Sequence, residues 1–339
     1  MRIGFNPLKD KELPPNDFFH QVIVPVYIPN QEGYFKDSFT IFKYCLASLF
    51  KTCHSKTYFT VVNNGCCQEV IDYLNDLHNQ GEIHELIHTT AIGKLNAVLK
   101  GLSGQNFQIV TITDADVLFL NDWQKRTYAV FEAFPKAGAV CPTPSSKTIR
   151  QNTSNVLIEN LFSKEMKFTP VINQKALQAF AISIGNPDFY NKYQLDNYLT
   201  VANGTVKAVV GAGHFVTSYK GTVFNTLKER YSNFSLGGNS EIELLDKPVS
   251  EKGFWRLSTE DNYAYHMGNT LESWMEEAFE NCKILTEEGA FPLKLAKVKT
   301  NSLLIWVQQL FFAKVLVRKP IWKWFLHFKG LSKEAASGY

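Results

Sequence analysis

The sequence lacks several features that would point to an exported or membrane-spanning protein. No run of about 18 apolar residues occurs, which argues against a transmembrane helix. The N-terminal stretch has no apolar core like that of a signal peptide, so we expect no export. The six cysteines show neither a disulfide-framework spacing nor a CxxC pair, so we expect reduced thiols and no zinc site. A cytoplasmic protein is therefore expected.

Acidic residues are missing from one long segment near the C-terminus. Residues 289–333 contain nine Lys and Arg but no Asp or Glu, although the net charge of the whole chain is only +3. The rest of the chain is therefore net negative, and the two parts suit different partners. With 339 residues, 45% of them hydrophobic and 20% charged, the composition is that of an ordinary globular protein. We expect one large domain with a C-terminal appendage.

The first half of the sequence alternates between strand and helix patterns. Short apolar runs alternate with helical spacings of apolar residues, which favours a parallel sheet covered by helices. The expected strands are 21–28, 57–65, 82–90 and 107–113, and the expected helices are 38–52, 68–81 and 93–102. In such sheets ligands bind beyond the carboxyl ends of the strands. The polar residues at these ends are Asn63, Asn64, Asp114 and Asp116.

Two acidic residues, Asp114 and Asp116, follow the fourth expected strand in the stretch TITDADVLF. Carboxylates at i and i+2 in a tight turn can point to the same side, and their oxygens suit Mg²⁺ or Mn²⁺. An ion held there would bridge a diphosphate and stabilise its charge as it leaves. The alternative is an Asx-type turn without a ligand. The position after a strand of an alternating α/β unit favours the metal site.

At this point the chain resembles a known family. The segments VIVPVY, FTVVNNG, GKLNAVLKGL and VTITDADVLF are similar to the nucleotide-binding half of family 2-like glycosyltransferases with the GT-A fold. The resemblance covers residues 20–270, and it implies a Rossmann-like α/β mixed sheet flanked by helices. It also implies a nucleotide-sugar donor and a D-x-D motif at Asp114 and Asp116. The donor-binding positions that it implies are Pro25, Val26, Tyr27, Asn63, Asn64, Lys94, Asn96, Asp114 and Ala115.

Two of these positions have their own alternatives. The family usually has an acid that contacts the nucleobase where this chain has Asn63 and Asn64; an amide can still bind a base edge, because it both donates and accepts hydrogen bonds. Lys94 follows Gly93 at the start of a helix, where the resemblance places it near the diphosphate. It could equally be a surface cation whose stem lies over the sheet.

A second stretch, residues 237–269, extends the resemblance. By that resemblance Glu241 is the catalytic base, and His266 is a third metal ligand or a contact of the diphosphate. An imidazole beside two carboxylates would favour Mn²⁺ over Mg²⁺. The family's usual acid pair reads Ser240-Glu241 here, so other acids compete for the role of base. These are Glu243, Asp246 and Asp261.

Each of these residues also has a purely structural alternative. Glu241 and Glu243 could be solvated helix acids, and His266 could be a core histidine among aromatic residues. The turn from Gly211 to His214 could approach the acceptor or the donor sugar, or it could be only a tight bend. The sequence favours the tight bend.

The C-terminal segment combines aromatic and basic residues. The apolar block 303–317 is too short and too polar to span a bilayer, and Pro320 separates it from the block 322–329. Such a segment either lies on an anionic membrane surface or packs on the domain. The tight alternation of apolar and basic residues in 322–329 favours the membrane there, whereas the two alternatives are balanced for 303–317. No recognised motif supports nucleic-acid binding.

We therefore expect a catalytic domain over residues 1–270, with a nucleotide-binding half at 20–122 and an acceptor half at 123–270. Residues 271–339 form the helical segment that associates with the membrane or packs. The expected activity is metal-dependent transfer of a hexose from a nucleotide-sugar to a hydroxyl of a glycan or lipid-linked acceptor. We expect inversion at the sugar, a role in bacterial surface polysaccharide or lipopolysaccharide synthesis, and a location on the inner face of the cell membrane. The alternatives are a catalytically silent membrane-associated partner and a nucleotidyltransferase, although the latter's Gly-rich basic loop is missing.

Overall fold

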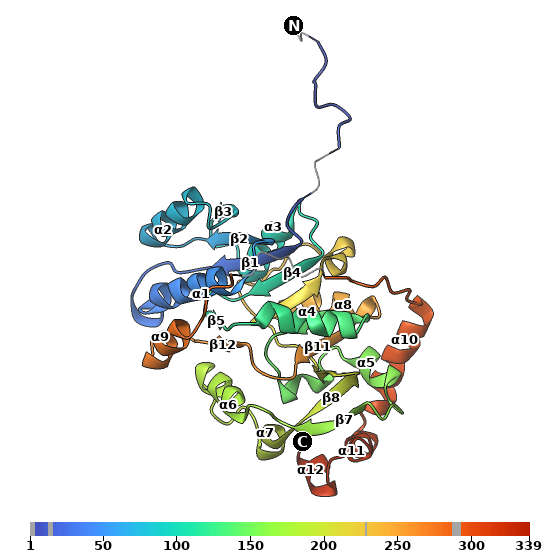
Figure 1. Ribbon diagram of the computed structural model, residues 1–339. Coiled ribbons are helices and arrows are strands. Elements are labelled where there is room, and N and C mark those ends of the chain that lie inside the picture. Colours follow the sequence, from blue (N-terminus) through green and yellow to red (C-terminus); the bar gives the residue numbers. More distant parts are fainter. Residues whose placement is uncertain (1–3, 13–15, 228, 287–292) are drawn as a thin grey trace.

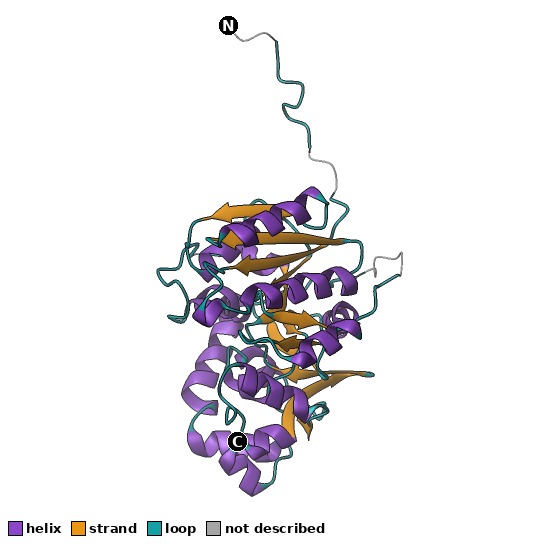
Figure 2. Ribbon diagram, turned by 90° about the vertical axis from the view of Figure 1, so that its left-hand side faces the viewer, coloured by secondary structure: helices purple, strands orange, loops and turns teal. Residues whose placement is uncertain are grey.

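The computed structural model describes residues 4–12, 16–227, 229–286 and 293–339. Its core is a sheet with helices on both faces (Figure 2). The strands are β1 (His20–Val26), β2 (Thr57–Asn64), β3 (Glu85–Thr89), β4 (Ile109–Thr113), β5 (Val117–Phe119), β6 (Ala137–Cys141), β7 (Met166–Pro170), β8 (Asn197–Asn203), β9 (Val206–Val210), β10 (Val216–Lys220), β11 (Trp255–Thr259) and β12 (Ala264–His266). The α-helices are α1 (Ser38–Thr52), α2 (Gln68–Asn79), α3 (Lys94–Leu102), α4 (Trp123–Ala133), α5 (Ser154–Glu159), α6 (Gln174–Ser183), α7 (Lys192–Asp196), α8 (Lys247–Glu251), α9 (Ser273–Glu280), α10 (Ser302–Phe311), α11 (Lys319–Phe328) and α12 (Lys333–Gly338).

One sheet runs through both expected halves of the domain. Its ten strands lie in the order β3-β2-β1-β4-β10-β6-β11-β9-β8-β7. β3, β2, β1 and β4 are parallel, as the alternating pattern predicts. β10 is antiparallel to both β4 and β6, so the sheet as a whole is mixed. The predicted fold class, a mixed sheet flanked by helices, is confirmed.

The strands β1, β2 and β4 are buried on both faces because helices cover each side, whereas β3 at the edge of the sheet is only partly buried. Val22 and Val24 of β1 pack with α1 and α2, whereas Ile23 between them packs with α3. This explains why β1 is a continuous apolar run instead of an alternating one. The helix pattern is confirmed by the buried Phe42 and Leu46 of α1. Because helices cover both faces, the polar groups that could bind a ligand lie at the carboxyl ends of the strands.

The C-terminal helices only partly follow the expectation for a membrane-binding segment. In α11, the side chains of Trp322 and Phe325 are buried against the apolar cluster that includes Leu199 of β8. Lys329 is buried too, and its Nζ donates to the carbonyl oxygens of Asn160 and Ser163. The packing alternative therefore holds for these three residues, because their surface is already covered. Trp324 and Phe328 of the same helix are exposed, so the membrane interpretation of 322–329 stays a prediction.

The structure also bears on the expected absence of a membrane-spanning helix and on the state of the cysteines. Among the described residues, no helix combines the length and the apolar character needed to cross a bilayer. All six cysteines are free thiols, as expected.

Two buried histidines, one at the start of β1 and one between α1 and β2, make the stability of the protein sensitive to acid. His20 and His54 both hydrogen-bond the hydroxyl of Tyr128, and Nε2 of His20 lies 2.7 Å from Oγ1 of Thr111. Burial, with a smaller contribution from His54, holds the pKa of His20 well below its usual value; burial lowers the pKa of His54 to about 4. In the unfolded chain both rings take up a proton below about pH 6.5. The folded state therefore loses stability as the pH falls through the window from about 6.5 to about 4.

We expect the melting temperature to fall between pH 7 and pH 5, with His54 alone costing roughly 2 kcal/mol. Thermal unfolding followed by circular dichroism at both pH values measures this. The variant His54→Gln, which cannot take up a proton, should show a smaller pH dependence. An identical pH dependence in wild type and variant would contradict the assignment.

Candidate active site and metal centre

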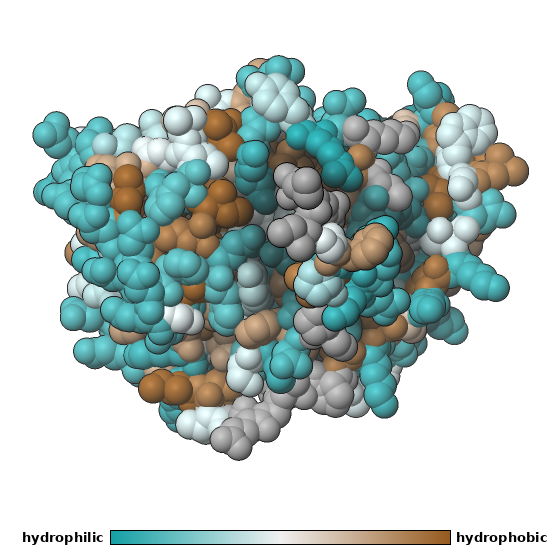
Figure 3. Space-filling view, turned by 90° about the horizontal axis from the view of Figure 1, so that it is seen from above, coloured by the Kyte–Doolittle hydropathy of each residue, from teal (hydrophilic) through white to brown (hydrophobic). Residues whose placement is uncertain are grey.

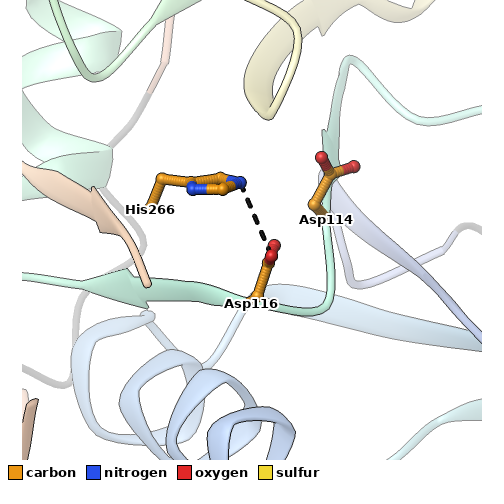
Figure 4. Close-up of side chains that lie close together, drawn as sticks. All are labelled: Asp114, Asp116 and His266. Carbon is orange, nitrogen blue, oxygen red and sulfur yellow. Dashed lines mark ion pairs between the residues drawn. The ribbon is translucent and has the colours of Figure 1, made fainter. Parts of the chain in front are cut away.

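Two acids and a histidine converge at the carboxyl end of β4. Asp114 and Asp116 lie in the link between β4 and β5, and β5 pairs antiparallel with β12. That pairing sets His266 opposite Val117, and the amide of Met267 donates to the carbonyl oxygen of Asp116. A histidine 150 residues away in the chain is thus fixed beside the acid pair (Figure 4).

The three side chains can hold a divalent cation. One ligand atom from each of Asp114, Asp116 and His266 lies within 4.8 Å of the others. Nε2 of His266 is 3.5 Å from Oδ2 of Asp116, and its Nδ1 is 2.9 Å from the hydroxyl of Ser183, which fixes the ring. Oδ1 of Asp116 is buried without a hydrogen-bond partner. Two carboxylates and one imidazole suit Mn²⁺ better than Mg²⁺.

The charge balance of this cluster also fits a cation. Burial raises the pKa of Asp116, the positive field of His266 lowers it in part, and the nearby Asp114 adds to the rise. A buried carboxylate beside another one is stabilised when a positive charge is close. The residues present therefore fit a metal ion, and the unpaired oxygen of Asp116 is available as a ligand.

Lys94 connects the acid pair to the proposed base. It is the first residue of α3, after Gly93 in a left-handed conformation at φ 92°. Its Nζ lies 2.6 Å from Oδ1 of Asp114 and 2.7 Å from Oε1 of Glu241. Burial lowers the pKa of Lys94, but the two carboxylates outweigh burial and raise it. Lys94 is therefore a permanent cation inside the site, and the surface-cation alternative is wrong.

The four acids proposed as base occupy different environments. Glu241 faces Lys94 and lines a cavity, whereas Glu243 is exposed and pairs with Lys247 one helical turn away. Asp246 is fully buried and pairs with Arg256 at 2.7 Å. Asp261 accepts the amide hydrogen of Asn262 and lines neither of the two cavities described next. Only Glu241 combines contact with Lys94 and access to a cavity.

A cavity of about 490 Å³ opens beside the acid pair. Seven of the expected donor-binding residues line it, namely Pro25, Val26, Tyr27, Asn64, Lys94, Asp114 and Ala115, together with Asp116. Two others do not. Asn63 turns away, and its Oδ1 accepts the amide hydrogens of Gly65 and Cys66. Asn96 binds backbone groups of Ser232 and Ile92.

These two asparagines stabilise the walls of the cavity instead of lining it. Asn63 fixes the turn after β2, and Asn96 ties the loop that leads to Ser235 onto α3. Ser235 lines the cavity and its carbonyl oxygen accepts the amide hydrogen of Lys94. Both expectations of direct donor contact are therefore corrected, because neither side chain lines the cavity. Asn63 is held by two backbone amides and the ring of His88, and Asn96 is held by backbone groups.

A second cavity, of about 290 Å³, meets the first at Lys94 and Asp114. Its polar residues include Glu241, His214 and His266. Its wall is aromatic, with the rings of Phe180 and Phe215 stacked 5.2 Å apart. The further aromatic lining consists of Phe189, Tyr190 and Tyr265. The two cavities therefore share a charged centre formed by Lys94 and Asp114.

Sequence reasoning missed three side chains that fix this centre. His214, in the turn interpreted as a tight bend, lines the second cavity. Arg256 is buried in β11, and a single arginine between the apolar residues Trp255 and Leu257 was an available signal. Ser183 hydrogen-bonds His266, and no local sequence pattern predicts this contact.

Comparisons with known proteins complete the description. No family model and no curated protein matches the sequence. Among solved structures, the chain is similar to a mannosyltransferase, PcManGT from Pyrobaculum calidifontis in complex with GDP-Man and Mn²⁺, with 14% identity and a TM-score of 0.42 over 97% of this chain and 78% of that one. It is also similar to TarS of S. aureus, with 13% identity and a TM-score of 0.41 over 76% of this chain. That match spans 38% of TarS.

Proposed function

We propose that this protein is a metal-dependent glycosyltransferase of the GT-A type, similar to family 2. It would transfer a hexose from a nucleotide-sugar to a hydroxyl of a glycan or lipid-linked acceptor. The observation that carries the proposal is the cluster of Asp114, Asp116 and His266, with a buried, unpaired carboxylate oxygen, at the edge of a cavity of about 490 Å³. Acidic and imidazole ligands beside a cavity of this size suit a nucleoside diphosphate held through a metal ion.

The residues of the centre divide the chemistry among them. Asp114, Asp116 and His266 would hold Mn²⁺, or else Mg²⁺, and the ion would stabilise the negative charge of the leaving diphosphate. Lys94, already a half-buried cation, would add a second positive charge at the same place. Glu241 would accept the proton of the attacking hydroxyl.

The two cavities suggest which ligand goes where. The donor fits the first cavity, which the acid pair borders, and the acceptor fits the second, which Glu241 borders. Aromatic faces such as those of Phe180 and Phe215 are apolar platforms on which the carbon-bound hydrogens of a sugar ring can lie. An acceptor attacking from the second cavity, with the diphosphate in the first, would approach from the side opposite the leaving group. The configuration at the sugar would then be inverted.

The test is turnover of nucleotide-sugars by the purified protein in the presence of Mn²⁺. We expect release of a nucleoside diphosphate from one member of a panel of donors, slowly without an acceptor and faster with an oligosaccharide. A nucleotidyltransferase would instead release pyrophosphate from a nucleoside triphosphate and a sugar phosphate. No release from any donor would support the catalytically silent partner.

We also propose that α10 binds an anionic membrane surface, which would place the enzyme on the cytoplasmic face of a bacterial membrane, in surface polysaccharide or lipopolysaccharide synthesis. Ile305 and Gln308 point into the protein. The opposite face of α10 is apolar and exposed, with Leu303 at 69% and Trp306 at 59% of their full accessibility. Figure 3 shows apolar side chains among hydrophilic ones at the right-hand edge of the molecule, the edge that α10 and the chain leading to it form in Figure 1.

Charge selects a lipid surface over a second copy of the protein as the partner of this face. Lys314, Arg318 and Lys319 are exposed just beyond it, and the sequence from 289 to 333 contains no acid to pair with them. Two copies packed face to face would bring these cations together, whereas anionic headgroups would neutralise them. In Figure 1, α10 lies at the edge opposite α1 and α9, and α1 lines the donor cavity. The acceptor would therefore carry its reacting hydroxyl well away from the bilayer.

We expect the protein to sediment with vesicles of phosphatidylcholine and phosphatidylglycerol, but not with vesicles of phosphatidylcholine alone. The triple variant L303S, L304S and W306S should bind the anionic vesicles on the order of 100-fold more weakly, because three exposed apolar side chains are lost. The matched control is I172S with I182S, which removes two equally exposed apolar residues elsewhere. Concentration-dependent dimerisation that the triple variant abolishes, without vesicle binding by the wild type, would contradict the proposal.

A further inference from the structure

We infer that His214, oriented by Asp246 and Arg256, shares with Glu241 the proton that leaves the acceptor hydroxyl. This inference deepens the proposed glycosyl transfer and rests on it. It assigns a role to three residues that form a continuous chain of contacts behind Glu241, in which Asp246 and Arg256 are fully buried and His214 is half-buried. The geometry of each link in that chain carries the argument.

The first link fixes which nitrogen of His214 carries hydrogen. Nε2 of His214 lies 2.6 Å from Oδ2 of Asp246, whose side chain has no exposed surface. Asp246 is paired with Arg256 through its other oxygen, so it is an ionised carboxylate that can only accept. Nε2 must therefore be the donor. In the neutral ring, Nδ1 is then left without hydrogen.

The second link holds Asp246 and the turn that carries His214 in one arrangement. The guanidinium of Arg256 lies 2.7 Å from Oδ1 of Asp246 and donates to the carbonyl oxygens of Ala212 and Gln151. Both charged side chains are fully buried, so neither can leave the other without a large desolvation cost. Arg256 thus fixes Asp246 and the backbone two residues before His214 together.

The first position of the turn has no room for a side chain, so only glycine fits there. Gly211 adopts φ 107°, and a Cβ there would lie 2.2 Å from Oγ1 of Thr148. The imidazole of His214 therefore projects from a backbone that is constrained from both sides. A catalytic group has to be held in this way if its position is to survive substrate binding.

The third link is the approach of His214 to Glu241. Nδ1 lies 3.8 Å from Oε2 of Glu241, and both groups line the second cavity. Both atoms are hydrogen-bond acceptors, so a proton that arrives between them can be bound by both. The other oxygen of Glu241 is held by Lys94. Burial raises the pKa of Glu241, but the charge and hydrogen bond of Lys94 lower it overall, so Glu241 alone is a weak base.

The step balances without any further reactant. The acceptor O–H bond breaks as its oxygen forms a bond to the anomeric carbon of the donor sugar. The bond from that carbon to the diphosphate oxygen breaks, and the electron pair leaves with the nucleoside diphosphate. The proton stays between Oε2 of Glu241 and Nδ1 of His214, and water can remove it once the product has left. His214 contacts the reacting groups, whereas Asp246 and Arg256 are positioning residues.

The orientation is tested by nitrogen NMR of protein labelled with ¹⁵N-histidine, independently of any activity. The signals of His214 are identified by their absence in His214→Gln. We expect hydrogen on Nε2 in the wild type and a mixture of both forms in Asp246→Asn, since an amide can donate as well as accept. Hydrogen on Nδ1 in the wild type, or the same form in both proteins, overturns the inference.

The proton-sharing role is tested by turnover of the nucleotide-sugar that the wild type uses. We expect His214→Ala to lower kcat on the order of 10²-fold with the KM for the donor nearly unchanged, and added imidazole to restore part of the rate. His327→Ala, which removes an exposed histidine of α11, should change neither value. A loss expressed only in KM, or a lower kcat that imidazole does not raise, overturns the role. Absence of turnover in the wild type would contradict both the proposed function and this role. The NMR result would still decide how the ring of His214 is oriented.

Discussion

Replacing Asp116 by Ala should lower donor turnover by about 10³-fold or more. Of the two acids, Asp116 has the unpaired buried oxygen, whereas Asp114 is already paired with Lys94. Its loss would leave the metal with one carboxylate and one imidazole, and the charge of the leaving diphosphate would lose several kcal/mol of stabilisation. Release of nucleoside diphosphate in the presence of Mn²⁺ measures the effect. Binding of Mn²⁺, followed by electron paramagnetic resonance, should weaken in parallel.

The matched control for Asp116 is Asp122→Asn in the same segment. Asp122 is exposed and has a positive φ of 65°, a conformation that Asn tolerates well, so this variant removes one negative charge with little backbone strain. We expect nearly wild-type turnover and Mn²⁺ binding. If Asp116→Ala kept full turnover, or if both variants lost the same amount, the metal site would not be the one described.

Much of the first half of the fold could be predicted because its information is local. The apolar run of β1 and the helical spacing of α1 report burial by neighbours close in the chain, and the structure places them where the pattern does. The acid pair was predictable for the same reason, since an end of a strand is a local feature. Its third member, His266, came from the resemblance, and the β5–β12 pairing that fixes it joins residues far apart in the sequence.

The errors share a different physical cause. Asn63 and Asn64 are adjacent at the end of β2, yet Asn64 lines the donor cavity and Asn63 caps a turn, because successive side chains of a strand point to opposite sides. The pattern located the strand end but did not say which residue faces the cavity. Likewise the blocks 303–317 and 322–329 are both apolar and both carry basic residues. Which of the two is covered depends on β8 and its neighbours, and α11 is the one that packs there.

The second large effect is expected for Glu241→Gln, which should lower kcat by roughly 10²- to 10⁴-fold. The amide keeps the shape of the side chain but cannot take the acceptor proton. Lys94 retains Asp114 as a partner, so donor and metal binding should change little. Because the pKa of Glu241 lies below its usual value, the wild-type carboxylate is ionised throughout the neutral range, and the deficit should be the same from pH 6 to pH 8. Steady-state kinetics at several pH values measures kcat and KM separately.

Glu243→Gln is the matched control. It removes the same charge two residues further along the chain, from a side chain that is exposed and paired with Lys247. A surface pair of this kind contributes little to stability, so both kcat and the melting temperature should stay close to wild type. Two measurements, the rate of transfer and the binding of the nucleoside diphosphate, separate loss of a base from damage to the metal centre. Loss of a base should slow transfer to a sugar hydroxyl without weakening binding of the nucleoside diphosphate, whereas damage to the metal centre would weaken both. If Glu241→Gln bound the diphosphate as poorly as Asp116→Ala does, Glu241 would belong to the metal centre and the base would have to be sought elsewhere in the second cavity.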